Sequence, residues 1–165
     1  MKLRDATADD LPDLHALIES AYRGESARRG WSHEADLLDG ERTQLAELEA
    51  MLANPTQHLL LFHDGERPAC CVALSEKDGG LVYLGLLTVD PARQAGGLGK
   101  QLLAAAEDQA RTVFAASRIE MTVIAQRAEL IAWYERRGYG RTGERRPFPV
   151  EGRDDLEFVV LEKRL

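Results

Sequence analysis

Apolar and polar positions in the first third of the chain repeat mainly at helical spacing. Residues 2–6 predict a short first strand, and Thr7 then stands at an N-cap position with acidic residues in the turn that follows. Apolar side chains recur every three or four residues after this cap, which predicts a helix. A polar, irregular stretch over 23–40 separates that helix from a second one predicted over 42–53, which the following Asn-Pro pair ends.

The middle of the chain changes to apolar runs of strand length. Three such runs, 59–63, 68–75 and 81–89, are separated by glycine-containing turns and predict three consecutive antiparallel strands. The remaining elements are expected in the order helix, strand, helix, strand, strand: 96–116, 118–124, 129–137, 139–142 and 156–162. No repeat or domain boundary is visible, so residues 1–165 are expected to form a single α/β domain.

Composition and charge narrow the class of protein. The chain has 165 residues, 44% hydrophobic and 30% charged, which is typical of a globular domain with a full core. Its net charge of −7 argues against a nucleic-acid partner, because such proteins usually carry a basic face. The apolar runs are too short for a membrane span and no signal peptide is visible, which indicates a cytoplasmic protein without a membrane partner. Cys70 and Cys71 are adjacent and lack metal-type spacing, so no metal site is expected.

The segment 86–100 is the most informative part of the sequence. A strand ends at Val89, an Asp-Pro pair turns the backbone, and a helix follows. Glycines at 96, 97 and 99 remove Cβ atoms where backbone amides would approach a ligand closely. Those amides, together with the positive end of the helix, predict a site for the pyrophosphate of a nucleotide-type cofactor.

Two known phosphate-binding motifs do not fit this turn. The P-loop requires glycine at position 94 and serine or threonine at position 101, and the chain has glutamine at both. The dinucleotide fingerprint G-x-G-x-x-G fails because Leu98 and Leu102 occupy positions that need glycine. The preceding strand also follows a β-meander and does not open a βαβ unit. The alternative is a strand-to-helix turn that is rich in glycine but binds no ligand.

Residues 94–99, Gln-Ala-Gly-Gly-Leu-Gly, match the Gln/Arg-x-x-Gly-x-Gly/Ala signature of the GCN5-related N-acetyltransferase (GNAT) superfamily. The preceding strand, which ends in Leu-Thr-Val-Asp-Pro, and the later run 133–139, Trp-Tyr-Glu-Arg-Arg-Gly-Tyr, strengthen the match. The order of elements also resembles that family over nearly the whole chain. The resemblance implies an α/β (α+β) fold with a mixed, mostly antiparallel sheet of about seven strands, flanked by four helices and splayed between the fourth and fifth strands.

The resemblance places acetyl-CoA in the gap between those two strands. Its pantetheine would run along Leu87, Thr88 and Val89. A backbone amide of this strand polarises the thioester carbonyl in the family, which requires no nucleophilic side chain. The pyrophosphate would lie on the amides of the turn: Gln94, Ala95, Gly96, Gly97, Leu98, Gly99 and Lys100.

Arg127 departs from the family pattern, which commonly has an asparagine there that contacts the cofactor. We assign Arg127 to the cofactor site, where it could reach a phosphate, with an acidic acceptor as the alternative partner. Tyr134 matches the tyrosine that the family often uses as a general acid. When an amine attacks the thioester, coenzyme A leaves as a thiolate, and a phenol beside the sulfur can protonate it. The alternative role for Tyr134 is an aromatic core residue beside Trp133.

The acceptor side is implied to lie between the connection after the first helix and the loop over 145–154. A pocket of acidic and aromatic residues there would suit a cationic amine: Tyr22, Glu25, Trp31 and Glu34. Each of them could instead be an ordinary surface or loop-anchoring residue. Glu120 is the first candidate for the general base, because it interrupts an apolar pattern beside the expected gap. Glu34, Asp36, His33 or a chain of water molecules are the alternatives.

These features predict an acetyl-CoA-dependent N-acetyltransferase that acts directly on a primary amine of a small molecule or peptide. Two alternatives stay open: an acyl-CoA-binding regulatory module without turnover, and an acyltransferase that uses a longer acyl group or a hydroxyl acceptor. The sequence does not identify the acceptor, since a shared fold does not transfer substrate identity. A homodimer is also expected as an option, because final strands of this kind often support dimers in the family.

Overall fold

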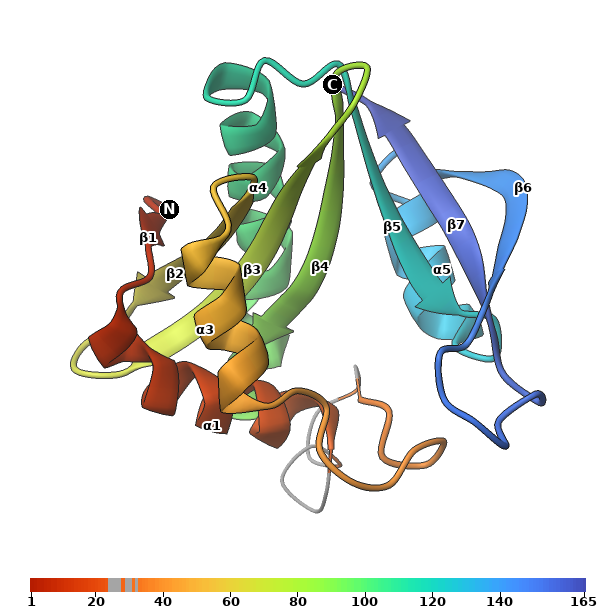
Figure 1. The fold of residues 1–165 in the computed structure, drawn as a ribbon, viewed down its shortest axis with the longest axis horizontal. Helices are drawn as coiled ribbons and strands as arrows, with labels where there is room; N and C mark the ends of the chain where they lie inside the picture. The colour runs from red at the N-terminus through yellow and green to blue at the C-terminus, as the bar shows by residue number, and fades with distance from the viewer. Residues whose placement is uncertain (24–27, 29–30, 32) are drawn as a thin grey trace.

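The computed structural model describes residues 1–23, 28, 31 and 33–165, and its seven strands form one sheet in the order β1-β2-β3-β4-β5-β7-β6 (Figure 1). The elements, with 3₁₀ helices marked η, are β1 (Arg4–Asp5), η1 (Ala8–Asp10), α1 (Leu11–Tyr22), α3 (Leu45–Ala53), β2 (Gln57–His63), β3 (Pro68–Lys77), β4 (Leu81–Val89), η2 (Pro91–Gly96), α4 (Leu98–Thr112), β5 (Arg118–Ile124), α5 (Ala128–Glu135), β6 (Gly140–Pro147) and β7 (Glu157–Arg164).

The sheet is covered on both faces, and each face has its own apolar core. Ile18 of α1 and Leu48 of α3 pack on one face. Leu102 of α4 and Ile131 of α5 pack on the other, where Leu60 of β2 joins them. In Figure 1, α1 and α3 lie in front of the sheet, and α4 and α5 lie behind it. The apolar stripes that predicted the helices are therefore the surfaces that bury the sheet.

The element order and the mixed sheet predicted from the sequence are confirmed. β2, β3 and β4 pair antiparallel in succession, and the one parallel pair joins β4 to β5. The long helix begins at Leu98 and not at residue 96, because residues 91–96 form η2. Within the described ranges, no helix has the length and apolar character of a membrane span, and no group of three or more side chains is arranged to bind a metal.

β6 is longer than the strand predicted over 139–142, since it continues to Pro147. This strand lies at the edge of the sheet and pairs only with β7. Nearly all of its side chains are exposed, so no alternation of apolar and polar residues marks its second half. A register shift between Arg141 and Arg145, around Gly143 with its φ of +86°, further interrupts the pattern.

β4 and β5 separate soon after they meet. Their parallel pairing is limited to three positions, which end at Tyr83 opposite Glu120. β4 then continues to Val89 and β5 to Ile124 without pairing to each other. The divergence of the two strands is visible at the centre of Figure 1. The splay expected between the fourth and fifth strands is therefore present.

A β-bulge lies where β4 leaves β5. The pairing with β3 skips from Thr88 opposite Cys71 to Gly85 opposite Ala73, and Leu86 adopts a positive φ of 49°. The carbonyl of Leu86 accepts a hydrogen bond from the Thr88 hydroxyl at 2.8 Å. Because this bond is buried, it stabilises a backbone conformation that is unfavourable for leucine. The bulge reorients the strand at the head of the gap.

Candidate functional site

The outer half of β4 presents its backbone to the gap. The amide of Asp90 donates to Ala69 of β3, so groups of alternate residues point away from β3. The carbonyl of Leu87 accepts a hydrogen bond from the Tyr22 hydroxyl at 2.8 Å, and that of Val89 accepts one from the Gln94 side chain at 3.4 Å. Since the N–H and C=O of one strand residue point the same way, the amides of Leu87 and Val89 also face the gap.

The glycine turn, residues 94–100, connects this edge to α4. Gly97 has a φ of +75°, which a residue with a side chain rarely adopts, and it ends η2 and begins α4. The amide of Gln101 is bonded to the carbonyl of Gly97, so the amides of residues 98, 99 and 100 precede the hydrogen bonds of the helix. Within the predicted range 94–100, these three amides at the start of α4 are the ones oriented as a helix N-terminus presents its donors.

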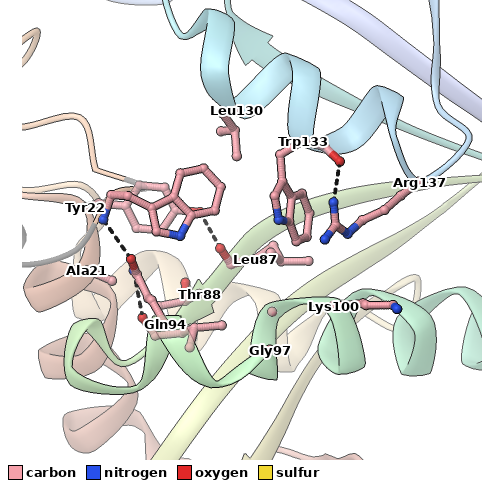
Figure 2. Close-up of a pocket in the computed structure, with 13 residues that line it drawn as sticks. Ala21, Tyr22, Leu87, Thr88, Gln94, Gly97, Lys100, Leu130, Trp133 and Arg137 are labelled. Carbon is pink, nitrogen blue, oxygen red and sulfur yellow. Dashed lines mark hydrogen bonds between the residues drawn. The ribbon is translucent and has the colours of Figure 1, made fainter.

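A pocket of about 90 Å³ lies between this turn and α5, and we call it the channel pocket. Figure 2 shows Leu87, Thr88, Gln94 and Lys100 on one side of it and Trp133 on the other. Seven of the predicted cofactor residues line this pocket: Leu87, Thr88, Val89, Gln94, Gly97, Gly99 and Lys100. Ala95, Gly96 and Leu98 support the turn but do not line the pocket.

Arg137 is a wall of the channel pocket that the sequence analysis missed. Its guanidinium lies 3.7 Å from the centre of the Trp133 ring, and its Nη1 donates to the Trp133 carbonyl at 2.7 Å. The Nε of Arg137 is buried, and no residue that the structure describes accepts a hydrogen bond from it. Burial, with a smaller effect from Arg136, lowers the pKa of Arg137. In the structure α5 ends at Glu135, and Arg137 lies in the turn that follows. In the helix predicted over 129–137, its i, i+4 spacing from Trp133 is the signal that could have identified it.

Tyr134 lies behind this wall and lines a second, larger cavity. Its side chain is buried, and its ring contacts the rings of Trp133 and Tyr139 edge-on. Its hydroxyl makes no hydrogen bond to any residue that the structure describes. Burial is the main cause that raises the pKa of Tyr134 above that of a free phenol, followed by the neighbouring Tyr22. The phenol therefore keeps its proton at neutral pH, which a general acid requires.

The larger cavity, which we call the inner cavity, has a volume of about 690 Å³. Its floor consists of the separating strands, residues 83–87 and 121–124, and its walls come from the segment 34–42 and from the loop 148–153. The loop over 145–154, which the resemblance assigned to the acceptor side, contributes residues 148–153 to this cavity. Leu38, Phe148 and Phe158 give one side of the cavity an apolar surface.

The charges of the inner cavity differ from the acidic pocket that the sequence predicted. Glu34 is buried, and its carboxylate accepts hydrogen bonds from Arg23 at 3.1 Å and from Arg127 at 3.4 Å. The guanidinium of Arg42 approaches the same carboxylate to 3.8 Å. Three arginines thus surround one glutamate, and Glu34 is held as a fixed counter-ion. Arg127 lines this cavity and not the channel pocket, so the structure places it away from the glycine turn.

Other predicted site residues have different surroundings from those expected. Tyr22 lies between the two cavities, with Arg42 5.2 Å from its ring centre, so the protein itself supplies the cation at this ring. Trp31 lines the channel pocket, 6.1 Å from Trp133 between ring centres. Glu25 lies outside the described residues. The carboxylate of Glu120 accepts hydrogen bonds from Arg146 at 3.3 Å, and this residue does not line either cavity.

Comparison with known proteins gives one family. The sequence pattern of the Acetyltransferase (GNAT) family matches residues 12–139. A protein named IAA acetyltransferase from Azospirillum brasilense is 28% identical over 130 residues, which cover 79% of this chain and 82% of that protein.

Solved structures show the same fold. A chimeric spermidine N-acetyltransferase from Vibrio cholerae superimposes with a TM-score of 0.74 at 17% identity, covering 99% of this chain and 96% of that one. A ribosomal-protein-alanine N-acetyltransferase from Brucella melitensis superimposes with a TM-score of 0.72 at 21% identity over the full length of both chains.

The environment of Glu34 predicts a structural role that can be measured. Replacing Glu34 with glutamine leaves buried guanidiniums without their counter-charge, so Glu34→Gln should lower the free energy of unfolding by about 3 kcal/mol in urea titrations. The matched control is Asp36→Asn, an exposed carboxylate 3.7 Å from Arg28. Its effect should stay within about 0.5 kcal/mol. Equal effects of the two substitutions would contradict the assignment of Glu34 as the buried counter-ion.

Proposed function

This chain belongs to the Acetyltransferase (GNAT) family, and we propose that it transfers an acetyl group from acetyl-CoA directly to a primary amine of a small molecule or peptide. One observation carries the proposal. The backbone of Leu87 and Val89 faces a gap that has the anion-binding start of α4 at one end and the Tyr134 hydroxyl at the other. These are the parts that a long thioester cofactor with a pyrophosphate needs.

The residues around the channel pocket fit such a cofactor. The amides of Leu98, Gly99 and Lys100 supply donors for a pyrophosphate, and Gly99 leaves room beside Trp133. Arg137, with its unpaired buried Nε, and the Lys100 ammonium add positive charge on the same pocket. The amides of Leu87 and Val89 supply strand-type hydrogen bonding for the pantetheine arm. The 3.4 Å contact between Gln94 and the Val89 carbonyl is long, and is therefore readily exchanged for another donor.

The chemistry proposed for the chain's own residues is limited to two roles. Bound acetyl-CoA supplies an activated thioester. A β4 amide at the bulge, at Leu87, donates to the carbonyl oxygen on which negative charge develops, as in an oxyanion hole. The Tyr134 hydroxyl donates its proton toward the departing sulfur. Glu120 is not part of this proposal, because Arg146 already holds its carboxylate and the side chain is not on a cavity wall.

The experiment that tests the function combines binding and turnover. Calorimetry should show acetyl-CoA binding with a dissociation constant below about 1 mM, and release of free thiol should follow when primary amines are added. Binding without thiol release across an amine library would favour a regulatory module. Preference for a longer acyl-CoA or for a hydroxyl acceptor would favour the wider acyltransferase activity. Absence of binding would overturn the proposal.

Gly99 provides a test of the cofactor position that leaves the fold intact. A Cβ at Gly99 would lie 3.7 Å from Trp133 and from Val89, an ordinary contact, so Gly99→Ala should fold normally. The added methyl group occupies the channel pocket and should raise the Kd for acetyl-CoA about 10-fold in calorimetry. Gly96→Ala is the matched control, because its Cβ would meet nothing within 4 Å. Unchanged affinity in both variants would remove the channel pocket from the cofactor site.

Tyr134 can be tested against a second buried tyrosine. Tyr134→Phe should lower kcat about 100-fold, with Kd for acetyl-CoA changed less than about 2-fold, since only proton donation is lost. Tyr139→Phe is the control: its hydroxyl donates to Glu107 at 3.0 Å on the side of α4, so its loss should affect stability and not kcat. Steady-state kinetics measure both effects. A wild-type rate for Tyr134→Phe would exclude its role as the acid.

A further inference from the structure

An arginine cluster lies at one end of the inner cavity: Arg23, Arg42 and Arg127 around Glu34. We propose that this cluster binds a carboxylate of the acceptor, so that the substrate is an amine that also carries a carboxylate group. Arg42 is its direct ligand. This inference rests on the proposed function and narrows the acceptor from any primary amine to an amino-carboxylate.

The balance of charge inside the cavity supports an anionic ligand. The side chains of Arg23, Arg127 and Glu34 are about a tenth exposed, at 12%, 9% and 9%. Arg23 and Arg42 both approach the Glu34 carboxylate, and two guanidiniums against one carboxylate leave an excess of positive charge among these three side chains. Buried charges interact strongly because water screens them little. An anion that enters this end of the cavity is therefore stabilised, whereas an ammonium group is repelled from it.

The arginines of the cluster differ in how many hydrogen bonds their guanidiniums make to other groups of the protein. Arg23 donates to Glu34 through two nitrogens and approaches the carbonyls of residues 39, 40 and 41 at 3.4–3.5 Å, so it fixes the loop. Arg42 is one-third exposed, and its 3.8 Å approach to Glu34 is too long for a hydrogen bond. Its guanidinium makes no hydrogen bond with a described residue. The fork of Arg42 is therefore available for a two-oxygen acceptor, and a carboxylate matches one fork.

Acidic residues also line the inner cavity, but they lie at its outer rim. Asp39, Glu41 and Glu151 are exposed, and so is Glu47, whose carboxylate is held by the Thr43 hydroxyl at 2.6 Å. Exposed charges are screened by water and contribute little at the inner end. The separation of a positive inner end from a negative rim leaves the carboxylate only one favourable position.

The length of α5 limits how far apart the two ends of the acceptor can be. Arg127 is the N-cap of α5, and Tyr134 follows seven residues later on the same helix. At 1.5 Å per residue this separation is about 10 Å along the helix. The acceptor nitrogen must lie near Tyr134, where the thioester sulfur is expected. Arg42 and Arg127 approach the same Glu34 carboxylate, so a carboxylate bound at Arg42 is expected on the order of 10 Å or less from the nitrogen, a range that covers amino acids and short ω-amino acids. The apolar surface of Phe148 and Phe158 favours members with an aromatic side chain.

The test compares amines that differ only in the carboxylate. The panel pairs phenylalanine with phenethylamine, tryptophan with tryptamine, and 6-aminohexanoate with hexylamine. Each compound is added to the CoA-saturated protein in calorimetry and to the acetyl-CoA-loaded protein in thiol-release assays. The wild-type protein should prefer the carboxylate member of at least one pair by about 10- to 100-fold in kcat/KM and in affinity.

Variants assign the effect to the cluster. Arg42→Gln should remove most of this preference by raising KM for the carboxylate member of the pair, while the Kd for acetyl-CoA stays unchanged in calorimetry. Arg42→Lys should restore part of it, because charge is kept and the fork is lost. Arg111→Gln is the matched control, an exposed arginine of α4 paired with Asp108. It should behave as wild type, which excludes a general effect of lost positive charge.

The outcomes separate the two proposals. Acetyl transfer that is equally fast with the decarboxylated amines, or unaffected by Arg42→Gln, overturns the carboxylate inference and leaves the acetyltransferase function standing. Carboxylate binding that depends on Arg42 but produces no thiol with any amine supports the inference and overturns direct acetyl transfer. Loss of both binding and transfer across the panel overturns both proposals.

Discussion

The separation of β4 from β5 is the constraint on which the site depends. A strand that loses its neighbour must find other partners for the backbone groups on that side, because unpaired buried amides and carbonyls are costly. Here the carbonyl of Leu87 accepts a hydrogen bond from the Tyr22 hydroxyl of α1. The carbonyl of Val89 accepts one from the Gln94 side chain of the glycine turn. The edge is thereby kept open for an extended ligand, and the helices around it are positioned by the same hydrogen bonds. The bulge at Leu86 lies three residues after the last residue of β4 that pairs with β5, Tyr83, and reorients the part of the strand that faces the gap.

The two cavities differ in the groups that they present to a ligand: mainly backbone groups in the channel pocket and side chains in the inner cavity. The channel pocket offers mainly backbone amides and the positive start of a helix, which recognise a phosphate whatever the rest of the ligand is. The inner cavity offers side chains, and its charges are arranged around Glu34. Recognition by backbone groups persists when side chains change, because every residue supplies the same backbone groups. The side chains of a loop, in contrast, vary readily among related proteins. In the proposed function, the groups that hold the cofactor thus lie on the scaffold, and the groups that would select a substrate lie on segments 34–42 and 148–153.

The sequence predicted the fold and the glycine turn into α4 better than the charges of the inner cavity. Helices and central strands were predictable because each buries one face, and three glycines within four residues marked the turn. The second half of β6 was not predictable, since an exposed edge strand has no burial pattern. Glu34 looked like part of an acidic pocket because Arg23, Arg42 and Arg127 are distant from it in sequence and meet it only in the fold. The sequence analysis did not identify Arg137 as a pocket residue, because it belongs to a run of charged residues. Its spacing of four residues from Trp133 was the signal that could have indicated their contact.

The edge strand β6 has a consequence for how copies of this chain meet. A free strand edge can add a strand from another molecule, which leads to uncontrolled sheet growth. β6 carries charged side chains at Arg141, Glu144, Arg145 and Arg146, a register shift around Gly143, and a proline at its end. Arg145 forms an ion pair with Glu157 of β7, so these charges are tied to the sheet they protect. The outermost strand β6 therefore works against the addition of further strands at this edge of the sheet.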